Sequence, residues 1–238
     1  MFHPKGPTLA ELARQALSST TRGYDLLAPK FEYTPFRTPD ELLTPLVDAA
    51  LEAGPIDRVL DVCCGTGAVM RLLRPHARQH VVGVDLSQGM LDEARRLLQA
   101  QDEDTPFELV RGNALAMTFD QPFDVAASSG ASGHIIGDDQ HVYARRIHDA
   151  LRPGGRFLFP TAHMPSPLNP GWWLARGFNA AMHVRNALLK PPFVMFYLQF
   201  TVERATDVLE QAGFTVDVRA PYADTAFPHM RLVVATRR

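Results

Sequence analysis

The chain has few cysteines, no long apolar run and no marked excess of either charge. Only two of its 238 residues are cysteines, and they are neighbours, Cys63 and Cys64. Neighbouring residues of a strand point to opposite faces, so a disulfide between them would be strained, and two sulfur atoms do not make a zinc site. We expect both to be small, buried and reduced, as in a cytoplasmic protein.

The missing apolar and basic segments exclude further classes of protein. No window approaches the roughly 20 apolar residues of a membrane span, and residues 1–5 lack the apolar core of a signal peptide. The formal net charge of −2 argues against nucleic-acid binding, which needs a basic face. Asp138, Asp139 and His141 lie at a predicted helix start, which fits capping, so we expect no metal. A monomer and a homodimer both stay open.

What the chain does have is a regular alternation of strand and helix patterns. Apolar runs predict strands at 58–62, 81–84, 107–110, 123–128 and 156–159, and helical spacing predicts helices at 42–51, 68–73, 88–101 and 139–151. This order predicts a doubly wound, Rossmann-like α/β sheet, with its ligand beyond the carboxyl ends of the strands. A last helix between Thr201 and Gly213 precedes strands at 215–218 and 231–235, which should pair antiparallel because only a loop joins them.

Two segments lie outside this pattern. Residues 1–40 contain several aromatic residues among prolines, and residues 161–200 form a long insertion rich in proline, tryptophan and phenylalanine. Irregular segments of this length in a compact domain usually have a function. We expect the first to act as a lid and the second to cover the substrate site of the domain formed by residues 41–238.

Acidic side chains stand at the ends of two predicted strands, on either side of a glycine turn. Asp61 precedes Gly65 and Gly67, and Asp85 ends the next strand. An acid so close to the turn would repel a pyrophosphate, and Met70 stands where a dinucleotide site needs a third glycine. Asp61 suits an ammonium group and Asp85 suits ribose hydroxyls, although each could simply cap a loop or a helix.

Five short blocks follow one another along the chain, at 59–67, 83–91, 112–114, 123–125 and 151–156. In order and spacing they resemble the class I S-adenosylmethionine-dependent methyltransferases, in the branch of the ubiquinone and menaquinone methyltransferases. The resemblance implies a seven-stranded sheet, mostly parallel with the last strand antiparallel, and S-adenosyl-L-methionine as the cofactor. Two departures are Cys63, where the family has a glycine, and Asn113, where it has an acid.

The resemblance also implies roles for individual residues. Asp61, Gly65 and Gly67 would hold the methionine part of the cofactor, with Ser129 beside it, and Cys63 would also bind the cofactor. Asp85 would hold the ribose, Leu86 and Met90 the adenine faces, and Asn113 and Ala114 the adenine edge. Tyr24 is the first candidate for an aromatic lid over the cofactor, with Tyr33 and Phe36 as alternatives. Ordinary hydrophobic packing explains these aromatic residues equally well.

Two histidines are candidates for a catalytic base. A hydroxyl or carbon acid acceptor must lose a proton, and histidine can take it near neutral pH. His134 follows the fourth predicted strand and His163 the fifth, so both should border the pocket. His163 is the better placed of the two. His134 could equally be a residue at the start of a helix, with no catalytic role.

The insertion supplies the substrate-binding candidates. Trp172 and Tyr197 belong to an aromatic and methionine-rich wall that suits a flat or lipophilic molecule. Arg185 and Asn186 could bind a carboxylate or phenolate of that molecule. The spacing from Trp172 to Met182 predicts an amphipathic helix, which could also be an ordinary part of the core.

These features favour an enzyme that methylates a small, aromatic or lipophilic acceptor. A non-catalytic S-adenosylmethionine-binding regulatory protein is the alternative, since neither histidine is recognisable as a catalytic base from the sequence. Nucleic-acid methylation is disfavoured by the charge and by residues 128–131, which lack an Asn/Asp-Pro-Pro-aromatic block. A quinone-like acceptor would allow peripheral contact with a membrane, without stable insertion, although the insertion has few cations.

Overall fold

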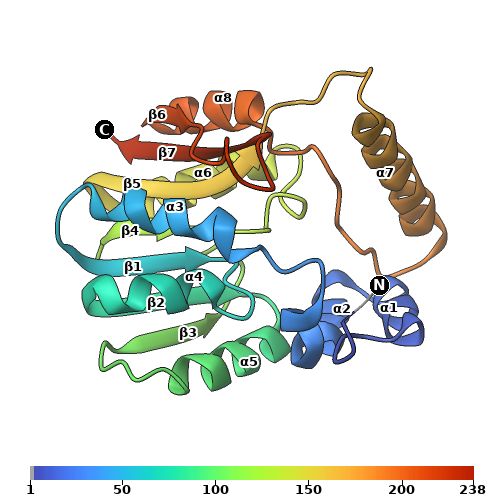
Figure 1. Ribbon diagram of the computed structural model, residues 1–238, viewed down its shortest axis with the longest axis horizontal. Coiled ribbons are helices and arrows are strands. Elements are labelled where there is room, and N and C mark those ends of the chain that lie inside the picture. Colours follow the sequence, from blue (N-terminus) through green and yellow to red (C-terminus); the bar gives the residue numbers. More distant parts are fainter. Residues whose placement is uncertain (1–2) are drawn as a thin grey trace.

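The computed structural model describes residues 3–238 and contains a seven-stranded sheet between layers of helices (Figure 1). The strand order is β3-β2-β1-β4-β5-β7-β6. The strands are β1 (Ile56–Val62), β2 (Ala77–Asp85), β3 (Phe107–Arg111), β4 (Phe123–Ala127), β5 (Leu151–Ala162), β6 (Phe214–Arg219) and β7 (Met230–Arg237). β7 runs antiparallel to both β5 and β6, and the other neighbouring pairs are parallel. The topology confirms the predicted doubly wound sheet with an antiparallel last strand.

Each face of the sheet is covered by helices that turn an apolar stripe toward it. One face packs against α3 (Asp40–Leu51), α4 (Ala68–Leu73) and α5 (Gln88–Gln99), and the other against α6 (Asp139–Ala150) and α8 (Val202–Ala212). A short 3-10 helix, η2 (Arg74–His76), joins α4 to β2. Leu46 and Leu98 are fully buried in the first layer, and Ile147 and Leu209 in the second. The core therefore consists of two apolar layers, one on each side of the sheet.

The fifth strand is longer than the sequence predicts. β5 begins at Leu151, directly after α6, and includes the Pro-Gly-Gly segment that the sequence places between helix and strand. Phe123 of β4 pairs with Leu151, whereas Val125 pairs with Arg156, so the extra residues of β5 form a bulge. The positive φ of Gly154, 75°, belongs to this bulge. A local irregularity of the ladder therefore replaces the predicted loop.

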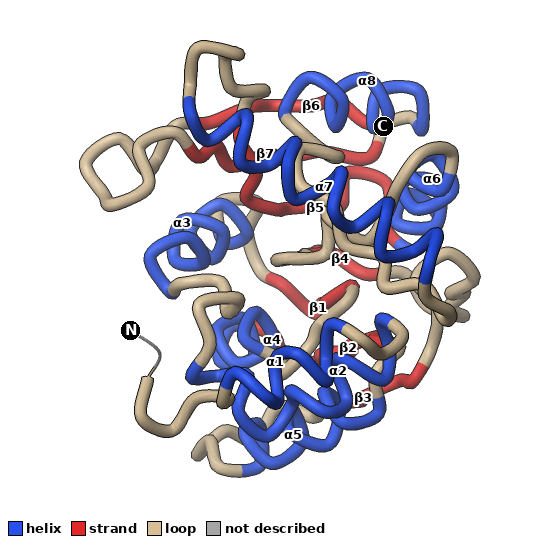
Figure 2. The backbone as a smooth tube through the Cα atoms, turned by 90° about the vertical axis from the view of Figure 1, so that its right-hand side faces the viewer, coloured by secondary structure: helices blue, strands red, loops and turns tan. Residues whose placement is uncertain are grey.

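The N-terminal segment and the insertion lie beyond the carboxyl ends of the parallel strands (Figures 1 and 2). They contain α1 (Leu9–Ala16), α2 (Thr20–Leu27), the 3-10 helix η1 (Ala28–Tyr33) and α7 (Pro170–Leu188). Figure 2 looks onto this side of the molecule, where α7 crosses the view above α1 and α2. Within residues 3–238, each helix is too short or too polar to cross a membrane.

Gly83 of β2 is required by the packing beneath the glycine turn. A Cβ at Gly83 would lie 2.4 Å from Met70 Sδ and 2.9 Å from Cys64 Sγ. We expect Gly83→Ala to lower the free energy of unfolding by about 1–3 kcal/mol, because inserting a methyl group into a packed core forces its neighbours to move. Urea unfolding followed by circular dichroism measures this change.

Gly177→Ala is the matched control for that substitution. Gly177 lies inside α7, and a Cβ there would meet nothing within 4 Å among the described residues. Because alanine has the higher helix propensity, this variant should be unchanged or more stable by up to about 1 kcal/mol. Equal losses of stability in the two variants would contradict the packing argument.

Candidate active site

The turn between β1 and α4 bends sharply where β1 ends. Cys63, Gly65 and Gly67 have positive φ angles of 59°, 52° and 76°. Glycine adopts such angles freely, whereas the left-handed conformation costs a residue with a Cβ about 1–2 kcal/mol. The backbone therefore favours glycine at 65 and 67 and holds Cys63 in a strained conformation.

The carboxylate at the end of β2 holds this turn in place. Asp85 Oδ2 accepts a hydrogen bond from the Gly65 N–H (2.9 Å), and Oδ1 accepts one from the Ser87 N–H (2.9 Å). One side chain thus joins the turn after β1 to the start of α5. Burial raises the pKa of Asp85, and these N–H donors oppose the shift. Each oxygen keeps acceptor capacity for the hydroxyl groups of a ligand.

A second carboxylate, that of Asp61, is buried without a hydrogen-bond partner. Asp61 is 1% exposed, and both of its carboxylate oxygens lack a partner among the described residues. Burial, together with the charge of Asp85, raises the pKa of Asp61 to about 8. Burying an unpaired carboxylate is unfavourable, and a cationic ligand group nearby would relieve that cost.

A pocket of about 390 Å³ opens between the strand ends and the N-terminal segment. Ten of the side chains or turn residues predicted for the site line it, namely Tyr24, Cys63, Gly65, Asp85, Leu86, Met90, Asn113, Ala114, Ser129 and His134. Phe31, Phe36 and Val194 add apolar wall. Asp61 and Gly67 are outside the lining. The strand-end residues are therefore brought together at one cavity.

Tyr24 and His134 form a hydrogen-bonded pair in this pocket. His134 Nδ1 contacts the Val194 carbonyl oxygen, which can only accept, so Nδ1 carries the proton. In the neutral ring Nε2 is then the acceptor, and it receives a hydrogen bond from the Tyr24 hydroxyl (2.9 Å). Burial lowers the pKa of His134 and raises that of Tyr24, which favours neutral forms of both.

Asp25, which the sequence analysis does not identify, fixes α2 beside the pocket. Its Oδ1 accepts hydrogen bonds from the Ser87 hydroxyl (2.6 Å) and from the Gly89 N–H (3.0 Å) at the start of α5. A Cβ at Gly89 would lie 2.9 Å from the Asp25 Cα, so α2 and α5 approach closely only with glycine there. Asp25 thereby positions its neighbour Tyr24.

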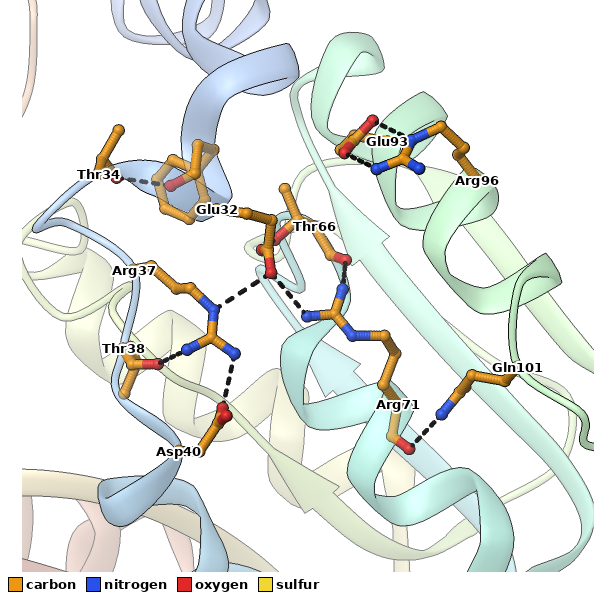
Figure 3. A network of polar contacts seen from close by, with 11 residues as sticks. Glu32, Thr34, Arg37, Thr38, Asp40, Thr66, Arg71, Glu93, Arg96 and Gln101 are labelled. Atoms are coloured by element: carbon orange, nitrogen blue, oxygen red, sulfur yellow. Dashed lines mark hydrogen bonds and ion pairs between the residues drawn. The ribbon is translucent and has the colours of Figure 1, made fainter. Parts of the chain in front are cut away.

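Glu32 attaches η1 to the glycine turn through an ionic network (Figure 3). Its carboxylate accepts hydrogen bonds from the Thr66 hydroxyl (2.6 Å), Arg71 Nη2 (3.0 Å) and Arg37 Nε (3.2 Å). Arg37 also donates to Asp40 at the start of α3 (2.6 Å). These side chains are mostly buried, at 16–22% exposure for Glu32, Arg37 and Arg71. The network ties the N-terminal segment to the turn that forms the pocket.

We expect Glu32→Gln to reduce the free energy of unfolding by roughly 1.5–3 kcal/mol, because it removes charge-assisted hydrogen bonds in a mostly buried network. The control is Asp207→Asn, which breaks the Arg204–Asp207 pair on α8, whose side chains are 36% and 54% exposed. Exposed pairs contribute about 0–1 kcal/mol. Denaturant unfolding measures the free energy of unfolding of both variants. Equal losses would show that the Glu32 network stabilises the protein no more than an exposed ion pair does.

His163 does not reach the pocket, contrary to the prediction. Its Nδ1 contacts Glu203 Oε1 at 2.7 Å, and both side chains are about half exposed, at 50% and 56%. The ring follows β5, but β5 extends to Ala162 and carries His163 out to the surface. Of the two predicted histidines, the structure places His134 at the pocket.

Arg185 and Asn186 hold the insertion together instead of lining the pocket. Arg185 donates to the carbonyl oxygens of Ala16 (3.0 Å) and Ser18 (2.7 Å), which attaches α7 to the end of α1. The Asn186 side chain exchanges two hydrogen bonds with the backbone of Phe193. These long-range partners satisfy the polar groups that the sequence analysis assigns to a substrate.

Trp172 and Tyr197 also lie outside the pocket lining. Trp172 packs edge-on against Trp173, with ring centroids 4.7 Å apart, and Arg176 stacks over its ring. Tyr197 is 44% exposed and packs against Phe178. These two aromatic residues therefore contact other residues of the insertion, and the apolar wall of the pocket includes Phe31 and Phe36 of the N-terminal segment, Ile135, Ile136 and Val194.

Comparisons with known proteins agree with this geometry. Residues 59–155 match a family model described as a methyltransferase domain. The 24-methylenesterol C-methyltransferase 2 of Oryza sativa subsp. japonica is 37% identical over 109 residues, 45% of this chain and 30% of that protein. A demethylmenaquinone methyltransferase of Listeria monocytogenes serotype 4b is 28% identical over 171 residues, 66% of this chain and 69% of that protein. Curated relatives above 30% identity, such as the rice protein, are matched over less than half of their own length.

A solved structure shares the whole fold. The N-methyltransferase NodS from Bradyrhizobium japonicum WM9, in complex with S-adenosyl-L-homocysteine, superposes with a TM-score of 0.66 at 14% identity. The match covers 92% of this chain and 99% of that one. At this identity the likeness establishes the fold.

Proposed function

We propose that this chain is a class I S-adenosylmethionine-dependent methyltransferase that transfers the methyl group of S-adenosyl-L-methionine to a small, lipophilic or aromatic acceptor. The observation that carries the proposal is the pair of carboxylates, Asp61 and Asp85, near the ends of neighbouring strands beside one pocket. S-adenosylmethionine has an ammonium group and two ribose hydroxyls but no phosphate. Asp85 fits the ribose hydroxyls, and Asp61, close to the glycine turn, fits the ammonium group and would repel the pyrophosphate of a dinucleotide.

The residues at the strand ends have the chemistry to hold this cofactor. We assign the ribose hydroxyls to Asp85, the ammonium side to Asp61 with Cys63, Gly65, Gly67 and Ser129, the adenine faces to Leu86 and Met90, and the adenine edge to Asn113 and Ala114. The unpartnered carboxylate of Asp61 supports this assignment, because a bound ammonium group would compensate its charge. When bound, S-adenosylmethionine supplies a methyl group that is already activated by a sulfonium.

The remaining task of the protein is to orient the acceptor and exclude water. Tyr24 and Phe31 stand over the pocket from α2 and η1, and aromatic faces stabilise nearby cations. Asp25 and Glu32 fix these two elements, so we infer that the N-terminal segment closes the site over the cofactor.

We infer that His134 is the proton acceptor for the substrate. Its Nδ1–H is committed to Val194, so the lone pair of Nε2 is directed toward Tyr24 and the pocket. An acceptor hydroxyl that donates to the Tyr24 oxygen would pass its proton to Tyr24, while the proton of the Tyr24 hydroxyl moves to this neutral nitrogen. A histidine with a lowered pKa stays unprotonated at neutral pH, as a base must.

The lining of the pocket favours a lipophilic acceptor. Phe31, Phe36, Ile135, Ile136 and Val194 supply apolar surface. A mostly apolar pocket with a few polar groups binds apolar small molecules in a defined orientation. The rice and Listeria relatives are named for a 24-methylenesterol and for demethylmenaquinone, which are lipophilic molecules as well.

Cofactor binding tests the assignment of Asp85. We expect Asp85→Asn to weaken binding of S-adenosyl-L-homocysteine roughly 10- to 100-fold, which corresponds to the roughly 1.5–3 kcal/mol of hydrogen bonds to a charged group. Asp92→Asn, on the exposed side of α5, is the control and should bind like the unchanged protein. Isothermal titration calorimetry measures both. Unaltered affinity of the Asp85 variant would remove this residue from the site.

The pH dependence of turnover tests the role of His134. Protonation below its lowered pKa removes the lone pair of Nε2, so kcat should be level near neutral pH and fall in acid below about pH 6.5. The charge of Asp85 opposes this lowering of the His134 pKa, and Tyr24 is the titratable group in contact with the His134 ring. His134→Asn should lower kcat about 10²- to 10⁴-fold and abolish the acid limb. His163→Asn should leave the pH profile of kcat unaltered. An acid limb that His163→Asn abolishes and His134→Asn retains would overturn the assignment.

Turnover distinguishes an enzyme from a regulatory binding protein. The protein is incubated with methyl-labelled S-adenosylmethionine and a panel of quinols, phenols and sterols, and labelled product is measured. Product from a lipophilic acceptor supports the proposal. Tight binding of S-adenosylhomocysteine without product from any acceptor would instead support a non-catalytic role.

A further inference from the structure

The buried residue of α7 is polar, whereas several large apolar residues of this helix are exposed. A surface helix normally turns its apolar residues toward the protein and its polar residues toward water. In α7 the buried residue is Asn179, whose amide exchanges two hydrogen bonds with the backbone of Tyr197, at 2.8 and 2.9 Å. Asn186, seven residues on and so on the same side, binds the backbone of Phe193 in the same way, and Arg185, between this side and the opposite one, binds the Ala16 carbonyl. Polar side chains therefore anchor α7, next to the partly buried Phe178 and Met182.

The opposite side of α7 is apolar and exposed. Six residues at helical spacing form what we call the α7 outer face: Trp173, Leu174, Gly177, Ala181, Val184 and Leu188. Leu174 and Leu188 are each 77% exposed, Trp173 63% and Val184 59%. Figure 2 shows α7 on the outside of the molecule, crossing the view in front of the sheet. Large aliphatic residues that gather on one exposed face indicate an interaction surface.

Charge around this face has a single sign. Residues 163–202 contain no aspartate or glutamate and three cations, Arg176, Arg185 and Lys190, although the whole chain has a net charge of −2. The end of α1, to which Arg185 attaches α7, continues the pattern: residues 12–24 contain Arg14 and Arg22 and no acid. The exposed side chain of Leu17 extends the apolar surface there.

We propose that the α7 outer face docks on an anionic lipid surface. A helix with one apolar face and flanking cations lies in the interface of a bilayer, with its leucine and tryptophan side chains among the acyl chains and its cations near the headgroups. A second copy of the chain fits less well, because two such faces would bring arginines and lysines together without an acid to pair them. Docking of this kind requires neither the cofactor nor the acceptor.

Docking through α7 would place the pocket next to the lipid. The segment that follows α7 returns to the pocket at Val194, whose N–H donates to Thr20 Oγ1 (2.7 Å), and both residues line the cavity. A lipophilic acceptor would then reach the site from the bilayer through a short path. This consequence rests on the proposed function, whereas the docking itself does not.

Vesicle binding tests the inference directly. The full chain is sedimented with vesicles of phosphatidylcholine alone or with added phosphatidylglycerol. We expect binding to the anionic vesicles, weakening as salt increases. Both tryptophans of the chain, Trp172 and Trp173, are in α7, so intrinsic fluorescence reports on this helix alone. Their emission should shift to the blue on binding and be quenched by brominated lipid.

Substitutions on the outer face identify the docking surface. Leu174→Gln combined with Leu188→Gln should lower the vesicle partition coefficient at least about tenfold, because two apolar side chains no longer enter the lipid. Val142→Gln removes an apolar residue with 42% exposure on α6 and is the control, which should partition like the unchanged chain. Circular dichroism and binding of S-adenosylhomocysteine should be unaltered in all three proteins.

Three results would overturn the inference. The first is the absence of binding to anionic vesicles at low salt, and the second is equal binding to neutral and anionic vesicles. The third is a lipid-independent blue shift that grows with protein concentration, together with a dimer in sedimentation velocity that the double variant abolishes. If vesicles bind a protein that fails to bind S-adenosylhomocysteine, the docking stands and the proposed function falls.

Discussion

The arrangement of the site depends on the carboxylate of Asp85. It accepts hydrogen bonds from the turn after β1 and from the first residues of α5, so two neighbouring βα connections are held at one point. Ser87, one of its donors, in turn donates through its hydroxyl to Asp25 of α2. A short chain of hydrogen bonds therefore runs from the sheet to the N-terminal segment, and the pocket lies between them. Because the same carboxylate faces the pocket, the group that organises the site is also available to a ligand.

The site retains local features that oppose stability. Cys63 adopts a left-handed backbone conformation, and Asp61 is buried with its carboxylate oxygens unpartnered among the described residues. A strained backbone and a buried acid with a raised pKa persist where the surrounding structure enforces them, and both are concentrated at functional sites. The Glu32 network and the packing of Gly83 against Met70 supply part of that enforcement. Binding of a cation beside Asp61 would convert an unfavourable burial into an ion pair.

The sequence predicts the sheet and the strand-end residues well, because apolar runs define the strands and parallel strands bring their carboxyl ends to one edge. The fold is confirmed, residues 59–155 match a methyltransferase domain, and the roles of the individual site residues stay predictions. The errors share a physical origin. Arg185 and Asn186 bind backbone groups, some of them far along the chain. Asp25 and Glu32 have partners more than 30 residues away. Local sequence patterns reveal neither set of contacts. The polar anchoring of α7 also depends on partners outside the helix.

A crystal structure of the full chain with S-adenosyl-L-homocysteine is the most direct test of this account. It should show the ribose hydroxyls within hydrogen-bonding distance of Asp85, the amino group on the side of Asp61, and Tyr24 over the homocysteine sulfur with its contact to His134 retained or taken over by a water. Ligand bound elsewhere, or in this pocket with its ribose away from Asp85, would contradict the account.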